Sequence, residues 1–324
     1  MRAVVVEQFG GPEALTLVDL PKPVPGPGEV VVQVAVSGVN FIDVYFRTGL
    51  YKVPPPVAIG SEAAGVVDAV GEGVTDVAPG DRVAYAMARG SYAEFAKVPA
   101  AQVVKIPDGV SFEQAAAVLL QGMTAHYLTK STYALKPGDT CLVHAAAGGT
   151  GALVVQMAKS LGARVFGTTS SAAKAAIATA AGADEVINYV EQDFAAEARR
   201  LTDGRGVDVV YDGVGKSTFE KSLDSLRVRG MLVLFGYASG AVTAIDPSAH
   251  LNAKGSLFVT RPGLANYIAT RDELLWRAGE VMDMVASGAL TVRIDAVYPL
   301  ADAAEAHRAL EGRRTTGKLL IAAR

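Results

Sequence analysis

The fold is decided by one stretch, residues 141–169, which reads CLVHAAAGGTGALVVQMAKSLGARVFGTT. A short apolar run leads into a turn of alanines and glycines, and apolar residues then recur at helical spacing from Leu153 to Leu161. Gly162 stands where a helix commonly ends, and β-branched residues resume after Arg164. The pattern predicts a strand, a tight turn, a helix and a second strand, which together make one βαβ unit.

The small residues of the turn are spaced as in a phosphate site. Ala145, Gly148 and Gly151 stand three apart. Small residues allow a tight turn, the approach of a pyrophosphate to main-chain N–H groups, and close packing of the helix on the strand. The helix N-terminus adds a partial positive charge. We therefore expect Gly148, Gly149, Thr150 and Gly151 to cradle the pyrophosphate of a dinucleotide, with an ordinary strand-to-helix turn as the alternative.

The residues after the second strand favour NADPH over NADH. NAD-binding units usually carry Asp or Glu about 20 residues after the first glycine, where the acid holds a ribose hydroxyl. In this chain no acidic residue occurs over residues 140–183. We expect Ser170, Ser171 and Lys174 to receive the 2′-phosphate of NADPH, unless Lys174 is only a solvated helix residue.

Composition limits the classes of protein to which the chain can belong. Its 324 residues, half of them hydrophobic, are enough for two domains. It has no run of about 18 apolar residues and no signal-peptide pattern at its start, so we expect no membrane span. A net charge of −3 without a basic run leaves no electrostatic footprint for nucleic acid. The single cysteine, Cys141, excludes an internal disulfide and fits a cytoplasmic location.

The composition and the pattern of predicted elements change twice along the chain. Residues 1–123 are rich in valine, glycine and proline and predict a mostly β, barrel-like domain. Residues 124–262 alternate strands and helices, which predicts a doubly wound parallel sheet of the α/β class. Residues 263–324 are expected to return to the first domain and make it discontinuous. Besides the βαβ unit, the expected strands are 4–6, 30–36, 64–70, 82–86, 92–98, 185–188, 207–212, 231–235, 256–259 and 318–322, and the expected helices are 172–181, 192–201, 218–228, 272–287 and 301–310.

Several segments match a known family in one order along the chain. They include GVNFIDVYFRTGLY (38–51), GSEAAGVVDAVGEGV (60–74), HAAAGGTGALVVQMAK (144–159), GADEVINY (182–189) and KGSLFVTRP (254–262). With them the chain resembles the zinc-free quinone oxidoreductase branch, or zeta-crystallin branch, of the medium-chain dehydrogenase/reductase superfamily. The resemblance implies a discontinuous GroES-like barrel domain (1–123 and 263–324) and a Rossmann domain that binds NADPH (124–262).

The resemblance also implies that the zinc sites of the superfamily are lost. Its alcohol dehydrogenases bind catalytic zinc through a cysteine, a Gly-His-Glu motif and a further cysteine. Asn40 and Ser61 stand at the first two positions here, and no downstream cysteine can serve as the third ligand. Because zinc needs thiolate, imidazole or carboxylate ligands, we expect no metal site.

Further cofactor residues are implied by matching family positions. Asn40 and Thr124 correspond to positions beside the nicotinamide, and Tyr189 to one beside the adenine or the ribose phosphate. Arg261 and Arg313 correspond to positions that close over the cofactor. An ordinary surface role is the alternative for Tyr189 and for both arginines.

Residues near the ends of predicted strands complete the expected site. Val214 lies in the turn after one strand, and Phe235 and Gly236 end the next, where ligands bind in open α/β sheets.

Tyr45, Arg47 and Tyr51, together with Asn40, are the candidates for the substrate pocket, because they belong to the loop that follows Asn40. Aromatic residues at this spacing suit a protein core equally well.

The expected reaction is transfer of a hydride, or of electrons, to an acceptor that is already electrophilic. Without zinc there is no Lewis acid to polarise an alcohol or a carbonyl group, and a quinone needs none. Reduction of a quinone needs little help from a proton donor, and His144 is interpreted as a hydrogen-bonded core residue. The alternatives are an NADPH-dependent reductase of conjugated enones or alkenals, and a non-enzymatic NADPH-binding protein such as a crystallin or an RNA-binding protein. A homodimer joined through the edge strand of the nucleotide domain is also expected.

Overall fold

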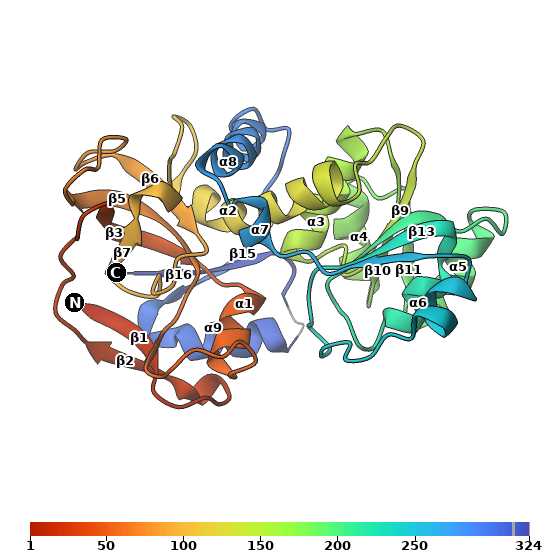
Figure 1. Cartoon of the computed structure of the whole chain (residues 1–324), viewed down its shortest axis with the longest axis horizontal. Helices are drawn as coiled ribbons and strands as arrows, with labels where there is room; N and C mark the ends of the chain where they lie inside the picture. Colours follow the sequence, from red (N-terminus) through yellow and green to blue (C-terminus); the bar gives the residue numbers. More distant parts are fainter. Residues whose placement is uncertain (313–314, 324) are drawn as a thin grey trace. The chain divides into compact units, whose positions relative to one another are not determined.

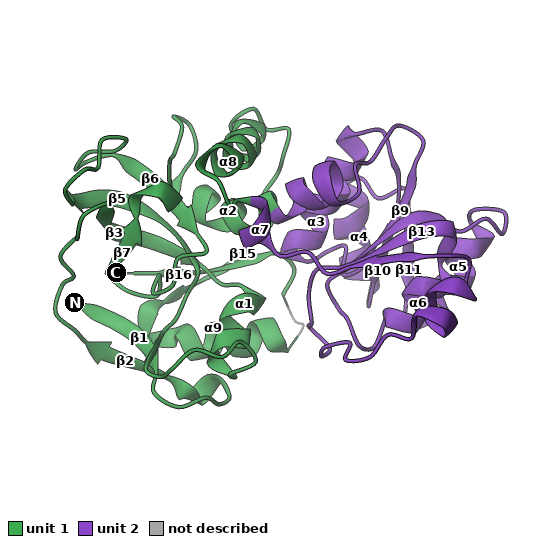
Figure 2. Ribbon diagram, viewed as in Figure 1, with its two compact units in different colours: residues 1–123, 268–324 green, residues 124–267 purple. Residues whose placement is uncertain are grey.

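The computed structural model describes residues 1–312 and 315–323, and the chain divides into two compact units (Figure 2). Unit 1 consists of residues 1–123 and 268–324, and unit 2 of residues 124–267. Residues 263–267, which the sequence pattern assigns to the first domain, lie in unit 2. There Tyr267 stacks on Tyr127 with ring centroids 4.3 Å apart, and its hydroxyl accepts a hydrogen bond from Thr132.

Unit 2 is built on a six-stranded parallel sheet (Figure 1). The strand order is β11-β10-β9-β12-β13-β14, and every neighbouring pair is parallel. Chain order reverses beside β9, which makes the sheet doubly wound and confirms the predicted fold class. The elements are β9 (Thr140–Val143), α3 (Gly149–Ser160), β10 (Arg164–Thr169), α4 (Ala172–Ala180), β11 (Glu185–Asn188), α5 (Phe194–Arg200), β12 (Val207–Asp212), α6 (Phe219–Asp224), β13 (Leu226–Leu234), β14 (Phe258–Thr260) and α7 (Leu264–Tyr267).

One helix boundary in unit 2 differs from the prediction. The sequence predicts a helix over residues 218–228, but α6 ends at Asp224 and β13 begins at Leu226. Leu226 is fully buried and pairs with Val207 of β12. Arg229 then has a φ of +58°, which a helix does not accommodate. Burial of Leu226 in the sheet therefore overrides the local helical pattern.

Unit 1 contains two sheets, and this confirms the predicted mostly β domain. The larger sheet has the order β15-β16-β3-β5-β6-β8, with β7 paired to β3, and the smaller has the order β2-β1-β4. The strands are β1 (Arg2–Val6), β2 (Leu15–Asp19), β3 (Glu29–Gly38), β4 (Val57–Ala58), β5 (Glu62–Val70), β6 (Arg82–Ala86), β7 (Phe95–Pro99), β8 (Val103–Lys105), β15 (Ile294–Pro299) and β16 (Lys318–Ala322). The sequence pattern missed β15, which pairs in parallel with the predicted last strand, β16.

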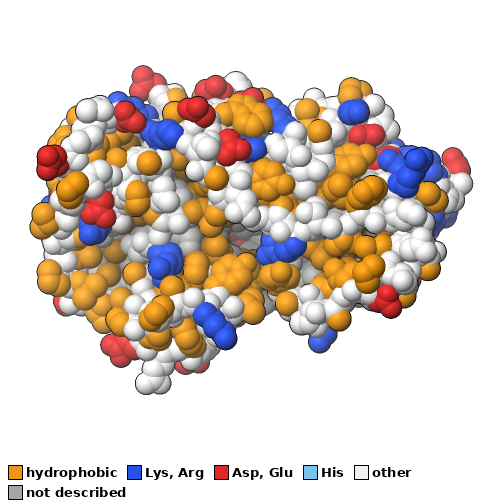
Figure 3. Space-filling model, viewed as in Figure 1, with side chains coloured by type: hydrophobic (Ala, Val, Ile, Leu, Met, Phe, Trp, Pro, Cys, Tyr) orange, Lys and Arg blue, Asp and Glu red, His pale blue; other side chains and the backbone are white. Residues whose placement is uncertain are grey.

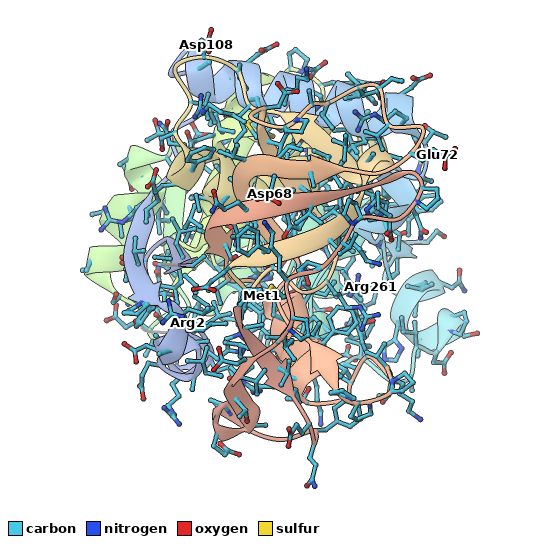
Figure 4. The ribbon with its side chains drawn as sticks, turned by 90° about the vertical axis from the view of Figure 1, so that its left-hand side faces the viewer. Met1, Arg2, Asp68, Glu72, Asp108 and Arg261 are labelled. Carbon is cyan, nitrogen blue, oxygen red and sulfur yellow. The ribbon has the colours of Figure 1, made fainter. Side chains whose placement is uncertain are left out.

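Close strand contact explains one glycine of unit 1. An added Cβ at Gly65 of β5 would lie 2.1 Å from the carbonyl oxygen of Gln33 in β3. Further along β5, the partly exposed Asp68 forms an ion pair with Lys22 at 2.7 Å, and the chain then turns at Glu72 (Figure 4). The carbonyl of Glu72 accepts a hydrogen bond from Gly28 at the start of β3, which closes this end of the sheet.

Among the described residues, four α-helices accompany the sheets of unit 1, and two of them were not predicted. These two are α1 (Phe41–Arg47) and α2 (Phe112–Tyr127), the second of which ends inside unit 2; α8 (Arg271–Ala286) and α9 (Ala303–Glu311) match the predicted pair closely. Helix α1 begins at Asn40, whose backbone N–H donates to the carboxylate of Asp43 at 2.9 Å in a capping box. The sequence therefore contains a helix start signal, but it lies inside a family motif that was interpreted as a loop.

The surface shown in Figure 3 carries acidic, basic and apolar side chains over each unit. Among the described residues, no helix is long and apolar enough to cross a membrane.

Candidate functional site

The glycine turn of unit 2 leaves no room for a side chain at Gly151 and little at Gly148. An added Cβ at Gly151 would lie 2.2 Å from the carbonyl oxygen of Ala145, and one at Gly148 would lie 3.1 Å from the same atom. Ala145 itself has a φ of +51°, and its carbonyl accepts a hydrogen bond from the N–H of Gly148 at 2.8 Å. Helix α3 begins at Gly149, so its first N–H groups lack partners within the helix. The turn fits the pyrophosphate of a dinucleotide.

Hydroxyl side chains and a lysine follow one another at the carboxyl end of β10 and the start of α4. Ser171 caps α4 and accepts a hydrogen bond from the N–H of Lys174, while Ser170 and Lys174 are partly exposed. The Oγ1 atom of Thr169 is buried and has no hydrogen-bond partner among the residues that the structure describes. An orphaned hydroxyl beside a serine and a lysine fits the 2′-phosphate end of NADPH.

The turn after β12 and the end of β13 lie in close contact. The carboxylate of Asp212 accepts hydrogen bonds from the N–H groups of Val214 and Gly215 at 2.8 and 2.9 Å, which fixes the turn after β12. An added Cβ at Gly236 would lie 2.5 Å from the carbonyl oxygen of Gly213 in that turn. Val214, Phe235 and Gly236 therefore form one edge of unit 2, at the carboxyl ends of adjacent parallel strands.

His144 is a hydrogen-bonded core residue, in agreement with the prediction. Its ring nitrogens lie 2.9 Å from the hydroxyl of Thr168 and 2.9 Å from the hydroxyl of Ser222. Burial lowers the pKa of His144, against an opposing effect of the nearby Asp212. The imidazole is therefore neutral near pH 7 and already occupied at both nitrogens.

The remaining cofactor candidates lie in varied surroundings. Tyr189 follows β11 and is 44% exposed, whereas Thr124 is buried in α2. The guanidinium of Arg261 lies 4.3 Å from the ring centroid of Tyr237, and its Nη1 donates to the carbonyl of Pro262 (Arg261 is labelled in Figure 4). Sequence reasoning missed Tyr237, because a stacking partner cannot be recognised from one strand end alone. Arg313 lies outside the described residues.

In unit 1, Asn40 is enclosed by polar side chains from distant segments. Its Oδ1 accepts from Nζ of Lys318 at 2.7 Å, and its Nδ2 donates to Glu62 at 2.9 Å. Nζ of Lys318 also lies 2.7 Å from Glu62, and the N–H of Leu120 donates to the other oxygen of Glu62. Asn40, Glu62 and Lys318 are at most 3% exposed. Sequence reasoning missed Glu62 and Lys318, although Glu62 belongs to the quoted Gly-Ser-Glu segment.

A second chain of buried bonds runs from Asp43 toward α9. Asp43 accepts from the hydroxyls of Ser61 at 2.6 Å and Tyr92 at 3.1 Å. Because Tyr92 donates to Asp43, it accepts from Nε2 of His307 at 3.2 Å, and Nδ1 of His307 is left to accept from Arg47 at 3.0 Å. We call Asn40, Asp43, Arg47, Ser61, Glu62, Tyr92, His307 and Lys318 the buried polar cluster.

Burial moves two pKa values in this cluster in opposite senses. It raises the pKa of Asp43 to about 6, against hydrogen bonds from Ser61 and Asn40 that lower it. Burial, assisted by the positive charge of Arg47, lowers the pKa of His307 to about 3. Near neutral pH, His307 is therefore uncharged and Asp43 is ionised.

Arg47 lies in a structural ion pair, which corrects its expected place in a substrate pocket. Its guanidinium donates to both oxygens of Glu311 at 2.6 and 2.9 Å and to the carbonyl of Gly10, and its side chain is 1% exposed. A buried guanidinium bonded in this way serves packing between α1 and α9, both of which belong to unit 1.

Tyr45 and Tyr51 pack together in unit 1. Their ring centroids are 5.4 Å apart in an edge-on arrangement, and Tyr51 lies 5.6 Å from Phe46 in the same manner. Tyr45 is buried and Tyr51 is partly exposed. Of the two, Tyr51 keeps the exposure that a substrate contact requires.

The chemistry at the zinc-ligand positions does not fit zinc. Over residues 1–312 and 315–323, no group of three or more His, Cys, Asp or Glu side chains could hold a metal ion. At these positions stand an amide, Asn40, and a hydroxyl, Ser61, and the neighbouring carboxylate, Glu62, is already bonded to the ammonium of Lys318. Zinc sites in proteins take thiolate, imidazole or carboxylate ligands.

Known proteins share the whole length of this chain. Residues 26–108 match the alcohol dehydrogenase GroES-like domain, and residues 181–321 match the zinc-binding dehydrogenase family. Quinone oxidoreductase 1 of Escherichia coli is 46% identical over 318 residues, 97% of each chain. A 2-haloacrylate reductase of a Burkholderia species is 42% identical and is covered to 98%, as is this chain.

A solved structure gives the same result in three dimensions. The crystal structure of Escherichia coli quinone oxidoreductase complexed with NADPH matches with a TM-score of 0.97 at 44% identity, over 99% of this chain and 100% of that one. The chain therefore belongs to the quinone oxidoreductase family of the medium-chain dehydrogenase/reductase superfamily.

Proposed function

We propose that the chain is an NADPH:quinone oxidoreductase that works without a metal ion. The observation that carries this proposal is the glycine turn of unit 2, followed at the end of β10 by Ser170, Ser171 and Lys174. When bound, NADPH supplies the hydride. The chain's own groups hold the pyrophosphate on the main-chain N–H groups of α3 and the 2′-phosphate on the hydroxyls and the ammonium beside β10.

A quinone suits the chemistry of unit 1 better than an alcohol does. Reduction of an unactivated carbonyl or oxidation of an alcohol needs a Lewis acid or a well-placed proton carrier. Asn40 and Ser61 stand at the zinc-ligand positions, and Asn40 is bonded to Glu62 and Lys318, which are also bonded to each other. A quinone is electrophilic without such help, and its reduced form is stable as an anion.

The test is an acceptor panel with purified protein and NADPH. We expect rapid NADPH oxidation with 1,4-benzoquinone and 1,4-naphthoquinone, no oxidation of simple alcohols, no stoichiometric zinc by elemental analysis, and no effect of a chelator. Activity that disappears with the chelator and returns with zinc contradicts the metal-free mechanism. Binding of NADPH without turnover of any acceptor would instead indicate a non-enzymatic NADPH-binding protein.

Reduction of a conjugated double bond is the second candidate function. It is favoured by the 42% identity with 2-haloacrylate reductase, which is close to the 46% identity with quinone oxidoreductase 1. Both reactions deliver hydride to an electron-poor carbon and need no Lewis acid. The quinone assignment fails if the protein reduces 2-haloacrylate or a conjugated enone efficiently and ignores every quinone tried.

We further propose a homodimer joined at the β14 edge of the unit 2 sheet, acting in the cytoplasm. Among the described strands, β14 pairs with β13 on one side and with none on the other. Phe258 of β14 is 56% exposed and Val228 of β13 is 64% exposed, so this edge carries apolar side chains. An exposed apolar edge invites pairing with a second copy. Light scattering at micromolar protein is expected to give twice the monomer mass, and a stable monomer contradicts the proposal.

A further inference from the structure

Two charged neighbours fix the direction of the Asn40 amide. Lys318 can only donate hydrogen bonds, and Glu62, its ion-pair partner at 2.7 Å, accepts them. The Asn40 carbonyl oxygen lies 2.7 Å from Nζ of Lys318, and its NH₂ group lies 2.9 Å from Glu62. A flipped amide would place a carbonyl against a carboxylate and an NH₂ group against an ammonium. Because all three residues are buried, solvent cannot relieve that conflict.

The direction of the Asn40 amide sets that of Gln121, in α2. Oδ1 of Asn40 is the acceptor for Lys318, and Nε2 of Gln121 lies 3.4 Å from the same oxygen. Gln121 must therefore present its NH₂ group to Asn40, and its carbonyl oxygen must face away. That oxygen, Oε1, is buried and has no hydrogen-bond partner within residues 1–312 and 315–323.

A buried acceptor without a partner destabilises the folded protein, so it calls for an explanation. The orientation that leaves Oε1 of Gln121 unsatisfied is imposed by Lys318, Glu62 and Asn40. A flipped Gln121 amide would turn its carbonyl oxygen toward Asn40 and could not donate to it. Gln121 as a residue is only partly buried, although its Oε1 atom is buried. Thr124, expected beside the nicotinamide, follows Gln121 by three residues in α2, and residues three apart share one face of a helix.

We propose that Gln121 is a ligand-binding residue whose side-chain carbonyl accepts a hydrogen bond from an N–H or O–H donor of the bound ligand, with Lys318, Glu62 and Asn40 as positioning residues. The inference rests on the proposed function. Under that function, two ligands offer such a donor: the carboxamide of NADPH and a hydroxyl group on the acceptor. A bare quinone carbonyl offers none, because two acceptor oxygens repel each other.

The first arm of the test asks whether the donor is the carboxamide. Calorimetry measures the binding of NADPH and of its reduced 3-acetylpyridine analogue, which has no carboxamide N–H, to wild type and to Gln121→Met. If the carboxamide is the donor, wild type binds NADPH more tightly than the analogue, and Gln121→Met weakens NADPH binding by about tenfold. The analogue's affinity stays within about twofold, so the preference for NADPH disappears.

The second arm asks whether the donor belongs to the acceptor. It compares KM for 2-hydroxymethyl-1,4-naphthoquinone with KM for 2-methyl-1,4-naphthoquinone, which lacks the hydroxyl. If the acceptor is the source, Gln121→Met raises KM for the hydroxymethyl compound by about tenfold relative to KM for the methyl compound, so the preference between the two quinones disappears. A merely structural role of Gln121 would move the constants for both quinones together.

Matched variants separate this role from packing. Gln114→Met makes the same change at the start of α2, where the Gln114 side chain accepts from the N–H of Ser111, and it is expected to alter neither preference. Gln121→Leu, which also lacks an acceptor, must reproduce the loss seen with Gln121→Met. The double variant Glu62→Gln with Lys318→Met removes the fixed polarity without leaving a buried charge, and it should reduce the same preference.

The outcomes are distinct. Loss of preference in either arm supports the proposal and identifies the donor. Unchanged preferences in both arms, with Gln121→Met and Gln121→Leu folded by circular dichroism, overturn it. Failure of the proposed function would look different, because wild type itself would then neither bind NADPH nor reduce quinones.

Discussion

The glycine turn of unit 2 takes its shape from the main chain, whereas the buried polar cluster of unit 1 takes its shape from side chains. In the turn, Gly148 and Gly151 matter for the atoms that they lack, since an added Cβ would meet the carbonyl of Ala145. In the cluster, Asn40, Glu62 and Lys318 come from three distant segments and hold one another by charge. Changes in unit 2 should therefore affect ligand affinity, and changes in the cluster should first affect stability.

Lys318→Met is expected to give the largest loss of stability, and it tests the contrast between the two regions. The substitution leaves Glu62 as an unpaired charge at 0% exposure, so the free energy of unfolding should fall by about 3–5 kcal/mol. Chemical denaturation measures it, followed by the fluorescence of Trp276, the single tryptophan, which lies in α8 of unit 1.

The matched control is an exposed ion pair. Lys22 pairs with Asp68 at 2.7 Å, but its side chain is 47% exposed, so Lys22→Met should cost less than about 1 kcal/mol. Equal losses of unfolding free energy in Lys318→Met and Lys22→Met would show that the buried ion pair stabilises the protein no more than the exposed one.

The second effect is a pH dependence with two opposed parts. Asp43 has its pKa raised from 3.8 to about 6, so its contribution to stability is full below pH 4 and is lost as the pH rises to 6. His307 has its pKa lowered from 6.5 to about 3, so its contribution is full above pH 6.5 and is lost as the pH falls toward 3. Between pH 4 and 6 the two contributions nearly cancel.

Substituting either residue should reveal the pH dependence of stability that the other contributes. Asp43→Asn should make stability rise with pH, and His307→Gln should make it fall, by up to about 1.4 kcal/mol per pH unit and about 3 kcal/mol over the window. Unfolding free energies measured at several pH values from 4 to 6.5 test this. Slopes that change in the same direction in both variants would refute the assignment of opposite shifts.

The same contrast explains what the sequence could predict. The glycine turn and the alternation of strands and helices depend on short segments, so both could be recognised in the sequence, and the fold class is confirmed. The site roles of Val214, Phe235 and Gly236 remain predictions. Arg47 was misplaced because its partner, Glu311, lies 264 positions away and shows no pattern with it. Helix α1 was missed because its start signal, Asn40 with Asp43, lies inside a family motif that suggested a loop. Residues that act through distant partners need the three-dimensional structure.

A third prediction concerns unit 2, where the effect should fall on the ligand. Lys174 is partly exposed on α4 beside the Ser171 cap, so Lys174→Ala should change the free energy of unfolding by less than about 0.5 kcal/mol. The same variant should weaken NADPH binding by about 1–3 kcal/mol, the scale of a charge-assisted hydrogen bond. NADH binding should be nearly unchanged, because NADH has no 2′-phosphate. Calorimetry with both cofactors measures this, and equal losses would remove Lys174 from the site.

The smallest effect is expected from Tyr51→Phe, which tests whether unit 1 contributes a proton donor outside the buried polar cluster. The Tyr51 ring packs edge-on against Tyr45 and Phe46, and the substitution retains those contacts. If Tyr51 only packs, kcat with 1,4-naphthoquinone should change less than about threefold, whereas a proton donor would lose on the order of 10²-fold. We expect the smaller change, because a hydroquinone anion needs little protonation. Tyr92→Phe is the comparison within the cluster: its buried hydroxyl bonds to Asp43 and His307, so it should cost about 1–3 kcal/mol of stability. A loss of order 10²-fold in Tyr51→Phe, with stability unchanged, would instead make Tyr51 the proton donor and place catalysis outside the cluster.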